Sequence, residues 1–189
     1  MRESRRVTMT KTMLKDSLLE LMSKKPLAKI SIKEICDNAD INRTTFYTHY
    51  TDQFALCTEI ESDAIEKTSD YLKKVTIDSS KIGFLSDYLH YIKENGHLIK
   101  TLLHSGCENN FRLRFVEISV AKLMEFDTHT NLSPTDRDYI FRYIFMGAMS
   151  IVEKWLDNDF DKPVNELARL IIALVPSITE TQKKALSYA

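Results

Sequence analysis

The chain has 189 residues, with 26 Lys and Arg against 27 Asp and Glu and a net charge of −1 at pH 7. This length suits one large domain or two small domains that share a core. Four glycines, four prolines and no low-complexity tract exclude a collagenous or disordered chain. The longest uninterrupted apolar run, 170–175, is too short to span a bilayer, and no signal peptide opens the sequence, so a compact cytoplasmic protein is expected.

The charge is unevenly distributed along the chain. Residues 1–50 hold ten Lys and Arg against six Asp and Glu, a net of +4, whereas the remaining residues hold sixteen against twenty-one, a net of −5. A basic N-terminal segment on an acidic body fits a protein that presents its N-terminal end to a polyanion. Arg2, Arg5 and Arg6 either extend this surface as an arm or form a plain solvated tail.

The sequence predicts an all-α fold of about nine helices, because no segment alternates β-branched and polar residues between hairpin turns. The first helix is expected at residues 8–23, where Leu14, Leu18 and Leu21 recur at helical spacing. Lys24–Pro26 ends it.

Ser31 and Glu34 predict the start of a short second helix. In such a capping box the hydroxyl accepts from a free amide three residues on, and the carboxylate reaches back to the amide of the cap. Ile35 and Cys36 then fall on one helical face. Asn38–Asp40 indicates a tight turn, because Asn and Asp tolerate left-handed backbone and bond to it locally.

A third short helix is predicted at residues 43–50, with Asn42 as its N-cap and Phe46 and Tyr50 on its buried side. Its other side chains can bond to phosphates or base edges, and none is a carboxylate that would repel a polyanion. A merely solvated helix would carry Glu and Lys in place of Thr, because these support helix formation better. The two helices predict a helix-turn-helix whose second helix enters the major groove of DNA, against the alternative of a small capped helix in an ordinary bundle.

The runs ISIKEI at 30–35 and INRTTFYTHYTD at 41–52 resemble the signature of the TetR/AcrR transcriptional regulators. The resemblance is strong across about residues 8–68 and weaker but continuous beyond them. The second run is also similar to the subgroup that contains regulators of dihydroxyacetone kinase operons. Two positions depart from the family pattern: Asp40 stands where the turn usually has Gly, and Gln53 where a phosphate-binding Lys is usual.

This resemblance implies a helix-turn-helix DNA-binding domain at 8–68 and a regulatory and dimerisation domain at 69–189. It implies a repressor that binds a palindromic operator in double-stranded DNA as a homodimer and is released by a small effector. The residues implied to read base edges are Arg43, Thr44 and Thr48. The residues implied to hold phosphates are Thr45, Tyr47 and His49, assisted by Ser31 and Lys33.

A long helix is predicted from Asp52 to about Val75, and in a dimer its tilt would change the separation of the two recognition helices. A turn at 77–80 precedes a helix that ends at Asn95–Gly96, a C-cap signal. A short helix at 97–104 and a longer one at 107–126 follow. Aromatic residues of this region are candidates to line an effector pocket, with plain core packing as the alternative for each. They are Tyr88, Tyr91, Phe111, Phe115 and Phe145.

The last two predicted helices, at 133–156 and 163–175, carry more apolar residues than one buried face requires. The surplus predicts an interface with a second copy, against the alternative of a monomer with a large core. Gly147 would let backbones approach closely there. The predicted interface residues are Tyr143, Gly147, Ile151, Trp155, Leu167, Ile171 and Leu174.

Signals of catalysis and metal binding are weak, and no enzyme, cofactor or metal is predicted. His90, His97 and His104 recur at intervals of seven, but Asn95–Gly96 and Gly106 interrupt any single helix through this region. Three cysteines, odd in number and far apart, suggest neither a disulfide framework nor a Cys-x-x-Cys zinc site. Gly-rich phosphate loops and hydrolase motifs are absent from the sequence. The remaining alternatives are a helical protein–protein adaptor and a regulator without a small-molecule effector.

Overall fold

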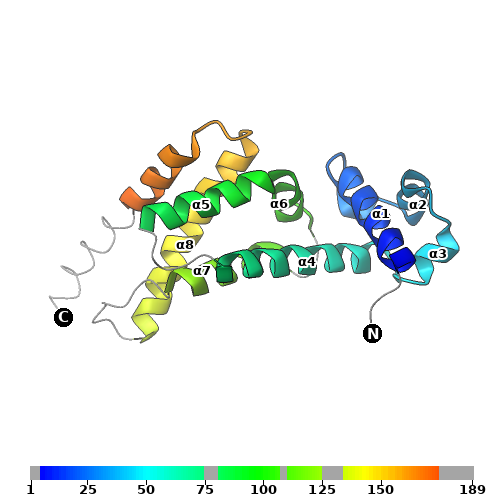
Figure 1. The fold of residues 1–189 in the computed structure, drawn as a ribbon, viewed down its shortest axis with the longest axis horizontal. Helices are drawn as coiled ribbons and strands as arrows, with labels where there is room; N and C mark the ends of the chain where they lie inside the picture. The colour runs from blue at the N-terminus through cyan, green and yellow to red at the C-terminus, as the bar shows by residue number, and fades with distance from the viewer. Residues whose placement is uncertain (1–4, 75–80, 107–109, 125–133, 175–189) are drawn as a thin grey trace. The chain divides into compact units, whose positions relative to one another are not determined.

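The computed structural model is all-helical over the residues that it describes, which are 5–74, 81–106, 110–124 and 134–174 (Figure 1). The predicted fold class is therefore confirmed. The labelled α-helices are α1 (Arg5–Met22), α2 (Ile32–Ala39), α3 (Arg43–Tyr47), α4 (Gln53–Lys74), α5 (Lys81–Glu94), α6 (Gly96–Leu103), α7 (Phe111–Met124) and α8 (Pro134–Asp157). A short 3-10 helix lies at Leu27–Lys29, and residues 164–174 form a further helix.

The chain forms two compact units. One contains the residues up to Thr68 together with His97–Arg114, and the other contains Ser69–Gly96 together with the residues from Phe115 onward. α4 crosses from the first unit into the second. The sequence predicted a single domain boundary, between residues 68 and 69. In the structure, most of α6 and the start of α7 also belong to the unit that contains the N-terminal helices.

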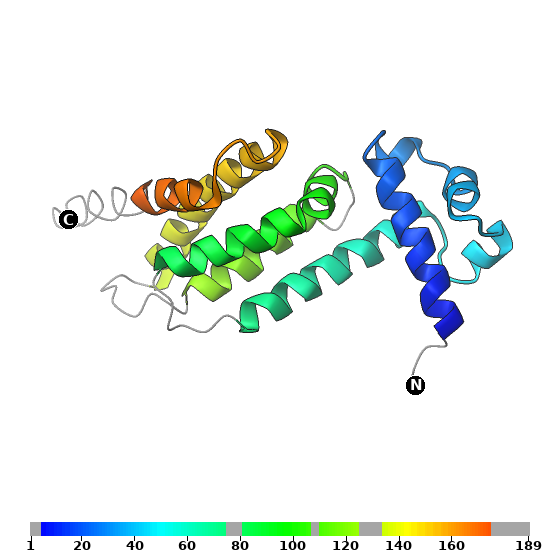
Figure 2. The same ribbon diagram turned by 45° about the horizontal axis from the view of Figure 1, so that its top comes forward.

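The N-terminal helices α1, α2 and α3 lie close together in the ribbon drawing (Figure 2), and their side chains form a small apolar core. Leu14 and Leu18 of α1, Ile35 of α2 and Phe46 of α3 are all fully buried. The hydroxyl of Ser17 on α1 donates a 2.8 Å hydrogen bond to the carbonyl of Ile35. This bond satisfies a buried polar group and fixes α1 against α2.

Two helix ends differ from their predicted positions. α1 begins at Arg5, three residues earlier than expected. α3 ends at Tyr47 rather than at residue 50, because a hydrogen-bonded turn replaces its last residues. In that turn the Thr48 hydroxyl donates to the Thr45 carbonyl at 2.6 Å, and the His49 amide donates to the Phe46 carbonyl at 2.9 Å. The predicted turn at 77–80 and the predicted helix ends at 107–109 and 125–133 lie outside the described residues.

α5 ends at Glu94, next to the predicted end at Asn95–Gly96, but Gly96 is itself the first residue of α6 and its backbone is not left-handed. A glycine is needed there for another reason, because a β-carbon would clash with the ring of Phe160. Phe160 packs edge-on against Trp155, with ring centroids 4.9 Å apart. The Trp155 indole donates a 2.8 Å hydrogen bond to the carbonyl of Lys162. These contacts fix the loop after α8 against Gly96.

Cys36 and Cys57 are both buried. Cys36 carries a free thiol, whose pKa is raised by burial, whereas Cys57 is disulfide-bonded. The spacing of the cysteines along the chain did not suggest a disulfide, because spacing does not report which residues approach in the fold. Among the described residues, no helix has both the length and the apolar character required to cross a membrane.

Candidate nucleic-acid interface

The start of α2 is held by the predicted capping box. The Ser31 hydroxyl accepts from the Glu34 amide at 3.3 Å, and the Glu34 carboxylate accepts from the Ser31 amide at 3.0 Å. The ammonium of Lys25 also bonds to this carboxylate. The bond from Lys25 has the largest effect and the bonds from Ser31 the next largest, and together they lower the pKa of Glu34 to about 2. Ser31 and Lys33 are both exposed at this end of α2.

Replacing Ser31 with alanine should lower the free energy of unfolding by about 1 kcal/mol at pH 7, because the Glu34 amide loses its partner. The pKa of Glu34 lies below its ordinary value of 4.5. The stabilisation that its carboxylate contributes to the capping box is therefore present above pH 4.5 and is lost as the pH falls towards 2. Urea unfolding of both proteins at pH 7 and pH 2.5 checks this. The difference between them should shrink at the lower pH, and an unchanged difference would contradict a reciprocal box.

Asp40 makes the turn between α2 and α3. Its backbone is left-handed, with φ 52° and ψ 43°, and the amides of Asp40 and Ile41 both donate to the carbonyl of Cys36. Asp is one of the few residues that enters this region readily, because its short side chain can bond locally to the backbone. The departure from the usual Gly at this position therefore leaves the turn intact.

α3 has only five residues, and Phe46 anchors it. Asn42 caps its start by accepting from the Thr44 amide at 2.8 Å. The Phe46 ring is fully buried and contacts the rings of Tyr50 and Tyr47, with centroids 5.6 and 5.7 Å away. A single buried side chain on so short a helix leaves the rest of its surface free for another role.

The outer surface of α3 and its following turn presents the residues that the sequence singled out. Arg43, Thr44, Tyr47 and Thr48 are exposed, and Thr45 and His49 are half-buried. Tyr47 is 57% exposed, which is unusual for so large an aromatic side chain. Because the Thr48 hydroxyl already donates to the Thr45 carbonyl, it offers an outside partner only its lone pairs. The structure thus gathers these six residues on one short segment, and their individual roles stay predictions.

An ion-pair network between α1 and α4 was missed at the level of sequence. The Lys15 ammonium lies 2.8 Å from the Glu59 carboxylate and 2.6 Å from the Asp63 carboxylate, and Lys11 reaches Glu59 at 3.5 Å. Burial opposes the charge of Lys15, but its bonds to Asp63 and Glu59 raise its pKa. The sequence pattern that could have predicted this network is a pair of bases four residues apart on one helix and a pair of acids four residues apart on another. The network ties the first half of α4 to α1.

Three of the predicted effector-binding residues come together in the C-terminal unit. The Tyr88 ring is stacked 6.2 Å from each of Tyr91 and Phe115, and Tyr71 is stacked 4.2 Å from Tyr91. The Tyr88 hydroxyl shares a 2.7 Å hydrogen bond with Ser119, and burial raises the pKa of Tyr88 well above its usual range. Of the other two candidates, Phe145 is buried on α8 and Phe111 belongs to the N-terminal unit.

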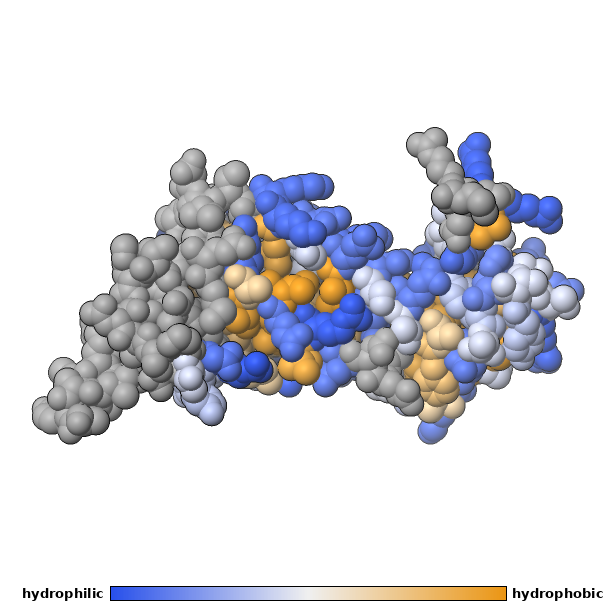
Figure 3. Space-filling model, turned by 90° about the horizontal axis from the view of Figure 1, so that it is seen from below, coloured by the Kyte–Doolittle hydropathy of each residue, from blue (hydrophilic) through white to orange (hydrophobic). Residues whose placement is uncertain are grey.

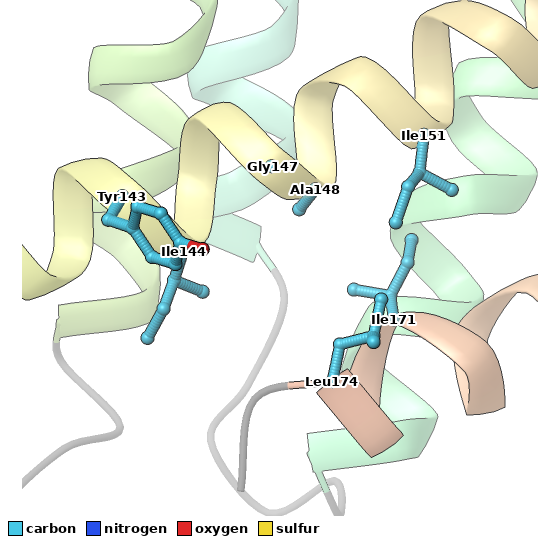
Figure 4. Close-up of a pocket in the computed structure, with 7 residues that line it drawn as sticks. All are labelled: Tyr143, Ile144, Gly147, Ala148, Ile151, Ile171 and Leu174. Atoms are coloured by element: carbon cyan, nitrogen blue, oxygen red, sulfur yellow. The ribbon is translucent and has the colours of Figure 1, made fainter. Parts of the chain in front are cut away.

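Five of the seven predicted interface residues line an apolar groove between α8 and the helix at 164–174. Ile151 and Ile171 point towards each other across this groove (Figure 4). The residues that line it are Tyr143, Ile144, Gly147, Ala148, Ile151, Ile171 and Leu174. Trp155 and Leu167, by contrast, are each only 2% exposed and pack inside their own unit, so they present no surface to a second copy.

The three spaced histidines do not form one stripe. His90 lies on α5 and His97 on α6, and the two helices are separated at Asn95. All three side chains are exposed, and the His104 ring nitrogen Nδ1 lies 2.9 Å from the Lys100 carbonyl. Within the described ranges, no group of three or more His, Cys, Asp or Glu side chains is arranged to hold a metal ion.

Solved structures with the same fold are transcription regulators. The TetR transcriptional regulator from Streptococcus agalactiae 2603V is 23% identical, with a TM-score of 0.69 over 90% of this chain and 96% of that one. The dihydroxyacetone kinase operon activator DhaS is 20% identical, with a TM-score of 0.59 over 91% and 97%. FadR from Bacillus subtilis, solved in complex with stearoyl-CoA, is 15% identical, with a TM-score of 0.59 over 87% and 96%.

Sequence comparison identifies the class more directly. The Uncharacterized HTH-type transcriptional regulator YxbF of Bacillus subtilis (strain 168) is 24% identical over 156 residues, which are 77% of this chain and 39% of that protein. The chain thus spans well under half the length of this relative. Residues 82–177 match the family model TetR_C_8, described as a transcriptional regulator C-terminal region. Fold and matches together define a helix-turn-helix transcription regulator.

The chain belongs to the TetR family of transcriptional regulators. The family that the sequence resembled is thereby confirmed, and so is a DNA-binding regulator rather than an enzyme. The likeness to DhaS concerns the fold alone, so the similarity to regulators of dihydroxyacetone kinase operons stays a prediction.

Proposed function

We propose that this regulator is a homodimeric, cytoplasmic repressor that binds a palindromic operator through two copies of α3 and is released by a small effector. The observation that carries the proposal is the outer surface of α3. Arg43, Thr44 and Tyr47 project from it, it bears no acid, and Phe46 alone anchors it. In a dimer of this kind the half-site centres lie about 34 Å apart, or a multiple of that distance, along the DNA.

The composition of α3 supports DNA reading over a structural role. Isolated helices this short do not persist, and Thr lowers helix propensity further. The capping bonds of Asn42 and the burial of Phe46 hold the helix in spite of this composition. Side chains that weaken the helix yet lie exposed on it are best explained by contacts with a partner. Arg and hydroxyl groups match base edges and phosphate oxygens.

The apolar groove between α8 and the helix at 164–174 supports the homodimer. Tyr143 is 65% exposed, and Leu170 and Leu174 are also exposed although they are large and apolar. Apolar side chains are also exposed among hydrophilic ones on the face drawn in Figure 3. A two-fold axis would place the same two helices of a second copy against the groove and make a four-helix interface.

The stacked aromatic cluster supports an apolar effector. Tyr88, Tyr91 and Phe115 meet beside Tyr71, which lies on the last turn of α4. A ligand that separates these rings would therefore act directly on α4, the helix that leads to the DNA-binding segment. A protein of the same fold, FadR from Bacillus subtilis, was solved in complex with stearoyl-CoA, whose acyl chain is apolar. A ligand shifts the operator equilibrium only as far as it binds one tilt of α4 better than the other.

The direct test is binding to random-sequence and operator-selected duplex DNA across a salt series. We expect steeply salt-dependent binding that enriches a palindrome, because phosphate contacts release counterions and base contacts select sequence. Tyr47→Ala should abolish it, whereas Tyr139→Ala, which removes an equally exposed ring on α8, should not. Absence of selection both without any effector and in the presence of an effector library would contradict the proposal.

Arg43→Ala should weaken binding to the selected operator by about 1–3 kcal/mol and relax the choice of base at one position of each half-site, because a guanidinium reads guanine bidentately. Tyr47→Phe should instead weaken all sequences alike, since a phosphate contact carries no sequence information. Competition binding on a panel of single-base operator variants separates the two effects. Lys67→Ala, which removes an exposed charge on α4, is the control. An unchanged profile would remove Arg43 from the base-reading residues.

A further inference from the structure

Glu61 of α4 is a completely buried carboxyl group, with 0% of its surface exposed. Its neighbours along the helix, Ile60, Ala64 and Ile65, are buried and apolar. A carboxylate removed from water is strongly disfavoured unless hydrogen bonds or an opposite charge replace its hydration. DNA binding does not use this group, so its burial needs an account of its own.

The hydrogen bonding of Glu61 is only half complete. Its Oε1 atom accepts a 3.1 Å bond from the hydroxyl of Ser105, which lies just beyond the end of α6. Its Oε2 atom is buried and has no hydrogen-bond partner among the described residues. The group that faces it from α6 is therefore neutral, and Arg114 on α7 acts on it through its charge. All three residues belong to the N-terminal unit.

This arrangement suits a neutral acid better than an anion. Burial raises the pKa of Glu61, while the Ser105 bond and the charge of Arg114 act in the opposite direction. Protonation leaves the Ser105 bond to Oε1 in place and removes the buried charge. Ionisation leaves a charge whose second oxygen is unsolvated, and that charge is relieved only if water reaches it.

We propose that Glu61 and Ser105 form a proton-dependent latch, which holds the end of α6 tightly against α4 when Glu61 is protonated and loosens when Glu61 is ionised. Loosening lets water reach Oε2 at the expense of the Ser105 hydrogen bond. Gly106 follows Ser105 directly with φ 65°, and apart from its chain neighbours no atom of the described residues lies within 4 Å of where its β-carbon would be.

The latch lies on the same two turns of α4 that carry the ion pairs to α1. Glu59 and Asp63 point towards Lys15, and Glu61, two residues from each, falls on the opposite side of the helix. A change in the contact between Glu61 and Ser105 therefore occurs next to the ion pairs that hold α1 to α4. The effect on operator affinity rests on the proposed function, whereas the latch itself does not.

The first test uses no DNA. Glu61→Gln keeps the size and the Ser105 bond of the protonated acid, and Glu66→Gln, an exposed change on the same helix, is the control. Because the pKa of Glu61 is raised in the folded state, its stabilising effect is complete below the ordinary value of 4.5 and is lost as the pH rises through the folded pKa. Urea unfolding between pH 4.5 and 8.5 should show the wild type losing stability relative to Glu61→Gln, but not relative to Glu66→Gln.

Hydrogen exchange separates a latch from a merely buried acid. The amides of His104 and Ser105 donate to the carbonyls of Lys100 and Leu102 at the end of α6. Their opening equilibrium, corrected for intrinsic exchange, should rise by up to about tenfold per pH unit in the wild type and stay constant in Glu61→Gln. Ser105→Ala should move the stability profile to higher pH, because the lost bond favoured the ionised form.

Parallel stability profiles for the wild type and Glu61→Gln, or α6 amides that open equally at every pH in both, would overturn the latch. The same variants are then compared on the selected operator. A pH dependence of affinity that disappears in Glu61→Gln connects the latch to DNA binding. Failure of every variant to select DNA would count against the proposed function and leave the stability and exchange results standing.

Discussion

Replacement of Phe46 by alanine is expected to lower the free energy of unfolding by about 3–5 kcal/mol, a loss typical of a fully buried aromatic side chain. Phe46 is 0% exposed and is the only fully buried side chain on the five residues of α3. A helix of this length has too few internal bonds to persist alone, so its position depends on this anchor. We therefore expect the recognition helix to be lost before the rest of the N-terminal unit.

The neighbouring tyrosine provides a matched control. Tyr47→Ala removes an aromatic side chain of similar size from the same helix, but from its exposed surface, where substitutions usually change stability by less than about 0.5 kcal/mol. Urea unfolding and operator binding of the two variants should therefore differ in pattern. Phe46→Ala should lose both stability and binding, and Tyr47→Ala only binding. A Phe46→Ala protein as stable as the wild type would show that α3 is held by other contacts.

The helix-turn-helix was predictable because its signals are local. Ser31 and Glu34 lie three residues apart, and the bonds that they form require only a helix to begin between them. The Asp40 amide donates to a carbonyl four residues earlier, and the Asn42 side chain accepts from an amide two residues later. The exposure of Arg43 and Tyr47 follows from the position of Phe46, because a short helix has room for one buried direction.

What the sequence could not predict depends on residues far apart in the chain. Gly96 looked like a helix cap, but its small size is required by Phe160, 64 positions later. Glu61 looked like one of many surface acids, and its burial depends on where α6 ends. Lys15 likewise meets Asp63 only because α1 lies against α4. Each of these contacts is created by packing, for which sequence spacing gives no measure.

The proposed dimer surface shows how far composition alone can reach. α8 is apolar nearly all round, so composition indicates that a second surface is buried but not which side faces outward. Tyr143 and Leu174 line the groove, whereas Trp155 is turned inward by its indole bond to Lys162. The surplus of apolar residues was therefore visible in the sequence. Which of these side chains face outward depends on the packing of the loop after α8.

Leu174→Glu should convert the protein to a monomer and lower its affinity for a palindromic operator by about 10²–10⁴-fold. Leu174 is 48% exposed at the edge of the groove, so its replacement leaves the fold of the subunit intact. In a two-fold dimer each substitution occurs twice, and each places an unpaired carboxylate in a surface that would be desolvated. Two linked heads bind two half-sites with an effective concentration that separate heads lack, which is the source of the expected factor.

Ile82→Glu is the matched control, because Ile82 is an aliphatic residue of similar exposure, 45%, that lies on α5 and does not line the groove. Sedimentation and operator binding of both variants, at one protein concentration, separate two claims. A Leu174→Glu protein that remains dimeric would show that the groove is not the interface. A monomer that keeps full operator affinity would show instead that each head binds independently, and the two-fold reading of the operator would fail. Only joint loss of the dimer and of affinity, with Ile82→Glu unaffected, fits a groove that spaces two recognition helices on DNA.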